Sequence, residues 1–279
     1  MLRDITIGQY YDVESVVHKL DPRTKIIATV VYIISLFCVK NILGFALAGV
    51  GLLLAVKLSR IPLKFILRGL KTIMVLLLFT VILNVFLVKG TPIVKWGFIS
   101  ISQEGIYTAV FMAARLILLI IGCSMMTLTT TPIQLTDGIE RLLRPLKKIK
   151  VPVHDIAMMM SIALRFIPIL LEETDKIMKA QTARGADFES GGLVQKAKSL
   201  IPVLVPLFIS AFRRADELAT AMEARCYHGD EGRTRMKELK YHTRDHIAKA
   251  CLILFLASLI ASRYLPSVTS IGAFLLSKW

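Results

Sequence analysis

The chain has 279 residues, of which 55% are hydrophobic and 20% are charged. Soluble domains average roughly 45–50% apolar and about 25% charged residues. The composition therefore excludes disordered chains, disulfide-stapled secreted modules and most soluble enzymes. The four cysteines form no CxxC pair, and the net charge is +15. In so apolar a chain this charge favours basic loops beside anionic lipid over nucleic acid as a partner. We interpret the chain as a membrane protein.

Five apolar blocks are candidates for spanning helices. In chain order they are Ile26–Val39, Ile42–Val56, Thr72–Val88, Ile106–Leu128 and Ala250–Ser262. A span needs ~20 residues, within a range of about 17–25. The third and fourth blocks qualify as they stand. The other three need flanking cations whose charged heads snorkel toward the interface: Lys25, Lys40, Lys57, Lys249 and Arg263. The sequence thus predicts an all-α polytopic membrane protein with about five transmembrane helices.

Loop charges predict the orientation of these spans. The loop between the second and third blocks carries five cations: Lys57, Arg60, Lys64, Arg68 and Lys71. Because such loops stay in the cytoplasm, we place this loop and the N-terminus there. The chain then divides into spans 1–4 (residues 1–128), a cytoplasmic domain (129–245), and a last span with the C-terminus (246–279). The expected location is the cell membrane.

The region 129–245 combines strongly apolar runs with many charges and prolines. This mixture is typical of long amphipathic helices lying at the cytoplasmic face of the bilayer. Helical spacing of apolar residues predicts two of them, Val153–Arg184 and Leu193–Arg225, after a shorter helix at Pro132–Lys148.

The two long helices end in similar sequences. One ends in Ala183-Arg184-Gly185 and the other in Ala224-Arg225-Cys226, with an aspartate at matching positions 41 residues apart. A single arginine at a helix C-terminus is explained by the helix macrodipole, for ~0.3–1 kcal/mol. Two matching ends suggest two equivalent binding partners, since the arginine fork can hold carboxylates and carbonyls together.

Small and flexible residues mark possible contact faces on the same helices. Ala211, Ala215 and Ala219 are spaced four apart, which lets two helix backbones approach closely, so we expect the long helices to cross there. High helix propensity alone also explains such alanines. Met159 and Met160, with Ala163 nearby, suit a surface that adapts to several partners, although core filling is the favoured interpretation of each methionine taken individually.

These motifs resemble those of the transmembrane T component of energy-coupling factor (ECF) transporters. The resemblance covers most of the chain. It includes Leu20-Asp21-Pro22-Arg23-Thr24-Lys25, Arg165-Phe166-Ile167-Pro168, the Ala-Gln-Thr-Ala-Arg-Gly run at 180–185, and the run from Arg214 to Arg225. Both arginine ends, in order, after four spans and before a last one, make the match specific. Cys226 departs from a glycine-ended motif.

The resemblance implies a non-enzymatic coupling subunit of a vitamin or micronutrient importer. Two cytoplasmic ABC-type ATPases would each receive one of the arginine ends. Their ATP-driven motion would pass to a separate, possibly interchangeable, substrate-binding membrane subunit (S component), docked at the methionine and alanine positions. The chain itself would bind neither metal nor cofactor, and it has no GxxxxGK[ST] loop for ATP.

Three alternatives remain open from the sequence. A T component dedicated to cobalt, nickel or biotin would look the same. An ordinary ABC importer permease normally presents one coupling helix, which the paired ends argue against. A membrane enzyme would need clustered aspartates at the membrane face, GxSxG or HExxH, and the chain has none of these.

Two further positions have structural interpretations. Arg115 lies midway along the fourth apolar block, where an ionisable residue is a functional candidate, but pairing with a backbone carbonyl or a carboxylate is the favoured interpretation. Asp21-Pro22 is typical of a helix start.

Overall fold

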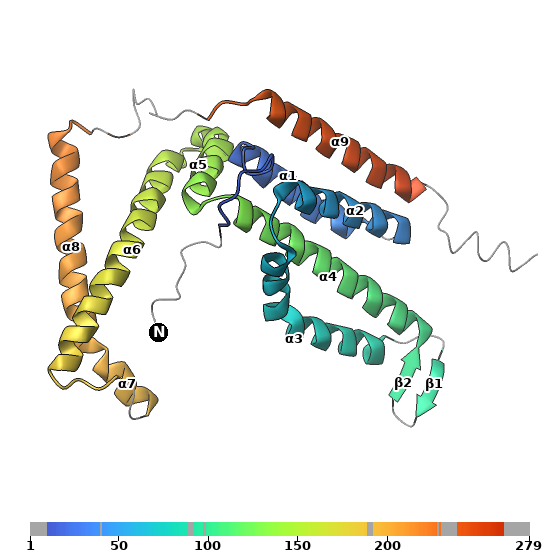
Figure 1. The fold of residues 1–279 in the computed structure, drawn as a ribbon, viewed down its shortest axis with the longest axis horizontal. Helices are drawn as coiled ribbons and strands as arrows, with labels where there is room; N and C mark the ends of the chain where they lie inside the picture. The colour runs from blue at the N-terminus through green and yellow to red at the C-terminus, as the bar shows by residue number, and fades with distance from the viewer. Residues whose placement is uncertain are drawn as a thin grey trace, which may run out of the picture. The chain divides into compact units, whose positions relative to one another are not determined.

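The computed structural model describes residues 10–39, 41–88, 92–96, 99–188, 192–227, 229 and 239–264. The helices are α1 (Pro22–Cys38), α2 (Ile42–Ser59), α3 (Leu63–Leu87), α4 (Gln103–Thr129), α5 (Pro132–Leu143), the 3-10 helix η2 (Arg144–Ile149), α6 (Val153–Ala183), α7 (Leu193–Ser199), α8 (Ile201–Ala224) and α9 (Thr243–Tyr264) (Figure 1). They form two compact units, one within residues 139–238 and one made of residues 8–138 with 239–279.

Among the described residues, five helical segments are long and apolar enough to cross a bilayer. They are Ile42–Ser59, Gln103–Thr129, Val153–Ala183, Val194–Ala224 and Thr243–Ser262. The bent helix α3 gives a sixth if its two halves form one span. The predicted all-α, multi-pass membrane protein is confirmed.

The set of candidate spans differs from the predicted one. Helix α1 has 17 residues, at the lower limit of the usual range. The two long helices predicted to lie at the cytoplasmic face are themselves long and apolar enough to span. Their charges gather toward the C-terminal halves, which leaves an apolar window in each N-terminal half.

The fold also contains a hairpin that the sequence analysis did not predict. Strand β1 (Pro92–Trp96) pairs antiparallel with β2 (Ile99–Ser102) between α3 and α4. A two-stranded hairpin this short gives little signal in hydropathy, because its residues read as a connection between two spans.

In the unit of residues 8–138 and 239–279, α1 and α2 pack against α4 and α9, and the four helices run side by side (Figure 1). Leu36, Ala48 and Ile66 are buried in its core. The helices approach closely at Gly122, where an added Cβ would lie 2.7 Å from the Tyr32 ring. Small residues permit this kind of contact between helices in a membrane.

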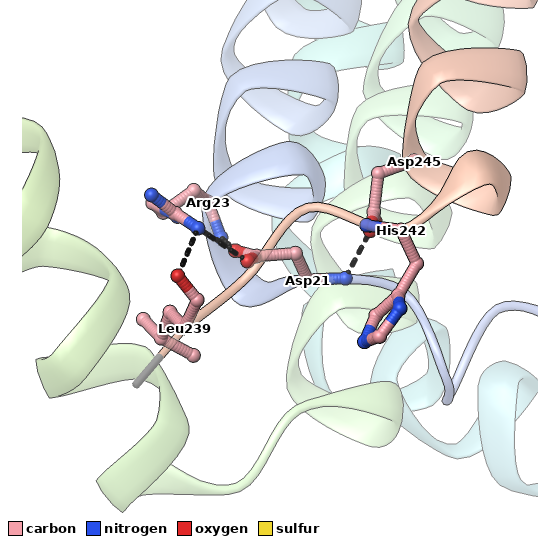
Figure 2. A network of polar contacts seen from close by, with 5 residues as sticks. All are labelled: Asp21, Arg23, Leu239, His242 and Asp245. Atoms are coloured by element: carbon pink, nitrogen blue, oxygen red, sulfur yellow. Dashed lines mark hydrogen bonds and ion pairs between the residues drawn. The ribbon is translucent and has the colours of Figure 1, made fainter. Parts of the chain in front are cut away.

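A buried polar network joins the first turns of α1 and α9 (Figure 2). Asp245, only 1% exposed, accepts hydrogen bonds from the backbone N–H groups of Asp21 at 2.8 Å and His242 at 2.9 Å. Asp21 in turn caps α1 by accepting from the N–H of Arg23 at 2.9 Å. The predicted helix start at Asp21-Pro22 is confirmed. One carboxylate thus ties two helix N-termini together.

Arg23 completes this network. Its guanidinium pairs with Asp21 at 2.7 Å and donates to the Leu239 carbonyl at 3.0 Å, and it lies 3.9 Å from the centre of the Tyr241 ring. Burial acts to raise the pKa of Asp21, but the hydrogen bonds and charge of Arg23 outweigh it, so this pKa is lower than usual. The segment that leads into α9 is therefore fixed against α1.

The flanking cations do not all behave as predicted. Lys25, expected to snorkel, is only 6% exposed, and its ammonium donates to the carbonyls of His18 at 3.1 Å and Thr129 at 2.8 Å. This prediction was wrong because backbone carbonyls in the turn before α1 and at the end of α4 satisfy the charge inside the protein. Lys40 and the side chain of Arg263 lie outside the described residues.

Arg115 has the structural role favoured by the sequence analysis. Its guanidinium donates to the carbonyl of Val39 at 3.1 Å and lies near the rings of Phe37 and Phe45, at 5.8 and 5.6 Å. The last carbonyls of a helix lack partners within that helix, and Arg115 supplies one at the end of α1.

Candidate functional site

Helices α6 and α8 form an antiparallel hairpin through α7 (Figure 1). The Gln181 amide donates to the Pro202 carbonyl at 3.4 Å near the turn, and an ion pair joins Glu173 to Arg214 further along. The C-terminal ends of the two helices therefore lie at opposite ends of the hairpin.

The sequence predicts one continuous helix over Leu193–Arg225, but the structure has two helices there. The segment divides at Leu200 into α7 and α8. Pro202 has no N–H to continue the helical hydrogen bonds and restricts the residue before it, which explains a break at this point.

The end of α6 is capped entirely by the backbone. Arg184 is the C-cap residue, and Gly185 follows it in the left-handed region with φ of +88°. The N–H of Gly185 donates to the Thr182 carbonyl at 2.9 Å, and the N–H of Ala186 donates to the Gln181 carbonyl at 3.0 Å. These two bonds define a Schellman motif, which leaves the arginine side chain uncommitted to the cap.

The end of α8 repeats the same motif at positions 41 residues later. Arg225 occupies the cap, and Cys226 follows with φ of +56°. The N–H of Cys226 donates to the Glu223 carbonyl at 2.8 Å, and the N–H of Tyr227 donates to the Met222 carbonyl at 3.0 Å. A cysteine has adopted here the backbone conformation that glycine adopts at the other end, at the steric cost of a Cβ.

All six residues of the two ends are exposed: Ala183, Arg184, Gly185, Ala224, Arg225 and Cys226. The small residues on either side of each arginine leave its guanidinium as the most prominent group of the end. Each guanidinium presents five donors in a fixed fork, suited to carboxylates and carbonyls of another protein.

An apolar hollow of about 280 Å³ lies between α6 and α8. On the α8 side it is lined by Ala211, Ala215 and Ala219 among others, and on the α6 side by Ile162 and Phe166. The predicted alanine stripe therefore faces α6. Small side chains of α8 thus face large ones of α6, and the space between the helices is not filled to the density of a protein core here.

Met159, Met160 and Ala163 lie elsewhere on α6. All three are exposed, and none of them lines the hollow between α6 and α8. They present an apolar surface outside the contact between the two helices. In the described part of the chain, no group of three or more His, Cys, Asp or Glu side chains is placed to hold a metal ion.

The Glu173–Arg214 ion pair was not identified from the sequence. The guanidinium donates to the Glu173 carboxylate at 3.0 Å, and the hydroxyl of Ser210 lies beside the same carboxylate. The pair obeys the 41-residue offset that relates the two helix ends. Opposite charges at equivalent positions of the repeat are the signal that could have found it.

Comparison with known proteins identifies the family. A family model described as CbiQ, cobalt transport protein, matches residues 13–236. The energy-coupling factor transporter transmembrane protein EcfT of Ruminiclostridium cellulolyticum is 58% identical over 264 residues, which cover 95% of this chain and 99% of the relative. The chain belongs to the EcfT family.

Two other relatives carry the same description. The protein of Clostridium kluyveri is 57% identical over 265 residues, covering 94% of this chain and 98% of the relative. That of Bacillus subtilis is 47% identical over 264 residues, covering 94% of this chain and 100% of the relative. The resemblance found in the motifs is confirmed. The chain is the transmembrane T component of an ECF transporter, a multi-pass membrane protein that acts in a complex with other subunits.

Proposed function

We propose that this T component is a non-enzymatic coupling subunit that docks two cytoplasmic ABC-type ATPases, one on Arg184 and one on Arg225. The observation that carries the proposal is the repeated end. Two helices finish in the same Schellman motif with an exposed arginine at the same position of each. Two equivalent surfaces suit two equivalent partners. We place α6 and α8 at the cytoplasmic face, because two spans in an antiparallel hairpin would put the arginine ends on opposite sides of the bilayer. Both ends, and with them the N-terminus of the chain, are assigned to the cytoplasm.

Each end suits an acidic or carbonyl-lined socket on an ATPase. The cap fixes the backbone through its own N–H groups, so the arginine needs no side-chain contact within the chain to hold its position. Its fork then makes two parallel bonds to one carboxylate. ATP would be bound and hydrolysed by the partners, and this chain would contribute no catalytic group.

The antiparallel hairpin would convert motion of the two ATPases into a change in its own geometry. Because the two ends lie at opposite ends of the hairpin, closure of an ATPase pair would move them relative to each other. That motion changes the angle between α6 and α8. This change in angle would be transmitted to a separate substrate-binding membrane subunit. That subunit would dock on the exposed surface of Met159, Met160 and Ala163. Flexible methionines allow such a surface to adapt to interchangeable subunits.

Copurification from the native membrane tests the proposal. The tagged chain should recover two ATPase subunits, and the double variant Arg184→Glu/Arg225→Glu should lose them, because each end would then repel an acidic socket. Lys179→Glu/Arg213→Glu is the matched control, since it reverses two exposed cations on the same helices away from the ends. Equal recovery with the double variant and its control would refute the docking site.

A second candidate is a T component dedicated to one metal ion. The description of the matching family model, cobalt transport protein, favours it. The same copurification decides between the two, because a shared T component recovers several different substrate-binding subunits and a dedicated one recovers a single kind.

A further inference from the structure

The Glu173–Arg214 ion pair lies at a special point of the α6–α8 hairpin. Arg214 is the residue equivalent to Glu173 under the 41-residue offset of the two helix ends. In an antiparallel pair of related helices, equivalent residues meet only where the helices cross at their pseudo-twofold axis. The contact at 3.0 Å therefore marks that axis.

The two arginine ends are placed symmetrically about this contact. Arg184 lies eleven positions after Glu173, and Arg225 lies eleven positions after Arg214. At ~1.5 Å per residue each end lies about 16 Å along its helix from the pair. A rotation about the contact would therefore displace both ends equally.

The residues around the ion pair leave the crossing angle of the two helices for the pair to determine. The apolar hollow of about 280 Å³ beside it is lined by three alanines of α8 and by larger apolar side chains of both helices, among them Phe166 and Leu218. Apolar contacts around an unfilled hollow do not strongly favour one crossing angle, whereas a charged hydrogen bond has a fixed geometry and can specify a register. The pair is half-buried, with 39% of the Arg214 side chain and 23% of the Glu173 side chain exposed.

We propose that the Glu173–Arg214 pair is the pivot of the coupling hairpin, holding α6 and α8 at one crossing angle and keeping the two arginine ends equidistant from it. Glu173 and Arg214 are positioning residues, since they touch no partner subunit in this assignment. The mechanical role rests on the proposed function, whereas the crossing geometry can be measured without any ATPase.

Spin-label distance measurement on the full chain tests the pivot. Labels are placed at Lys179→Cys and Thr220→Cys, two exposed positions that are equivalent under the same offset, in a chain whose native cysteines are replaced. The parent should give one narrow distance distribution. Glu173→Gln and Arg214→Gln should each lower the population ratio of this conformation to all others by about fivefold. This change corresponds to the upper end of the free energies measured for exposed ion pairs.

Three comparisons keep the result specific. The charge-swapped double variant Glu173→Arg/Arg214→Glu should restore most of the parent distribution. Glu172→Gln and Arg213→Gln, exposed neighbours of the pair, should leave it unchanged. If removing the pair alters the distribution no more than removing these neighbours does, or if the swap restores nothing, the pivot is refuted.

The same labels in the purified complex separate this inference from the docking proposal. With ATP and orthovanadate the parent distance should shift, and Glu173→Gln should retain its ATPases but lose at least half of the shift. Loss of ATPase binding in the Arg184→Glu/Arg225→Glu variant is an independent result. A full shift in Glu173→Gln would overturn the pivot without affecting the docking proposal.

Discussion

The exposed ends of α6 and α8 and the buried starts of α1 and α9 solve the same problem in opposite ways. Every helix end has backbone groups without partners in the helix. At Arg184 and Arg225 the backbone satisfies these groups by itself, through left-handed residues at 185 and 226. At Asp21 and Asp245 charged side chains satisfy them, and both carboxylates are buried.

The difference shows where charge is available for function. Arg23 is bound to Asp21 and to the Leu239 carbonyl, so its charge is used within the fold. Arg184 and Arg225 remain exposed on ends that hold their shape without them. Replacing a charge that stabilises the fold lowers the stability of the chain. Replacing a charge on an end that the backbone caps by itself should leave the fold intact. Substitutions on the two sides of this contrast should therefore differ in their effects on partner binding and on stability.

The largest effect is expected from reversing one arginine at a time. Arg184→Glu and Arg225→Glu should each weaken ATPase copurification by more than about 100-fold at that end, because a like charge facing an acidic socket costs several kcal/mol. Thermal unfolding of the detergent-purified chain should change little. Quantitative recovery of the ATPase subunits checks this, and a large loss for one variant with none for the other would contradict the equivalence of the ends.

The next effect is expected at the buried carboxylate. Asp245→Ala should lower the free energy of unfolding by about 2–3 kcal/mol, because the N–H groups of Asp21 and His242 lose a buried acceptor. Thermal unfolding in detergent measures it, with Asp216→Ala on the exposed surface of α8 as control. Equal stability of the two variants would show that water replaces the carboxylate without cost.

The two left-handed residues should respond in opposite directions. Gly185→Ala should destabilise the end of α6 by about 1–2 kcal/mol, since a Cβ there meets no atom within 4 Å and only the backbone conformation resists it. Cys226→Gly should stabilise the end of α8 by up to about 1 kcal/mol. Hydrogen exchange of the last turns is the measurement. Changes of the same sign at both ends would contradict the shared motif.

The smallest effect is expected from acid. The pKa of Asp21 is lower in the folded chain than in the unfolded one. Its contribution to stability is therefore complete above the unfolded pKa of about 4 and is lost as the pH falls through the folded value. The Asp21→Asn variant should show a shallower loss of stability below about pH 4 than the parent. Parallel curves for the two proteins would exclude this linkage.

The helix ends were predictable because their signals are local. Gly185 after Arg184, and the same spacing at Arg225, specify where a helix stops without reference to the rest of the chain. The left-handed conformation of Cys226 was not predictable from its residue type, because glycine normally supplies it. The match between the two helix ends is the one signal in the sequence that could have indicated it.

The polar network and the ion pair could not be predicted in the same way. Asp21 and Asp245 are 224 residues apart, and no pattern in the sequence links a buried carboxylate to a distant N–H. Lys25 was expected to reach outward because its neighbours in the sequence gave no sign of the carbonyls that surround it. The charges and prolines of the long helices indicate the membrane surface, whereas their length and hydropathy also suit a span, and neither property separates the two arrangements.

Photo-crosslinking in the native membrane tests the central claim most directly. A benzoylphenylalanine placed at Thr182 or at Glu223, each beside an arginine end, should form an adduct with an ATPase subunit, identified by mass spectrometry. The same probe at Glu172 or Arg213, on the same helices but away from the ends, should not. Adducts at both ends and at neither control are the predicted result. ATPase adducts at the controls alone, or at no position in an assembled complex, would contradict the assignment of Arg184 and Arg225 as the docking ends.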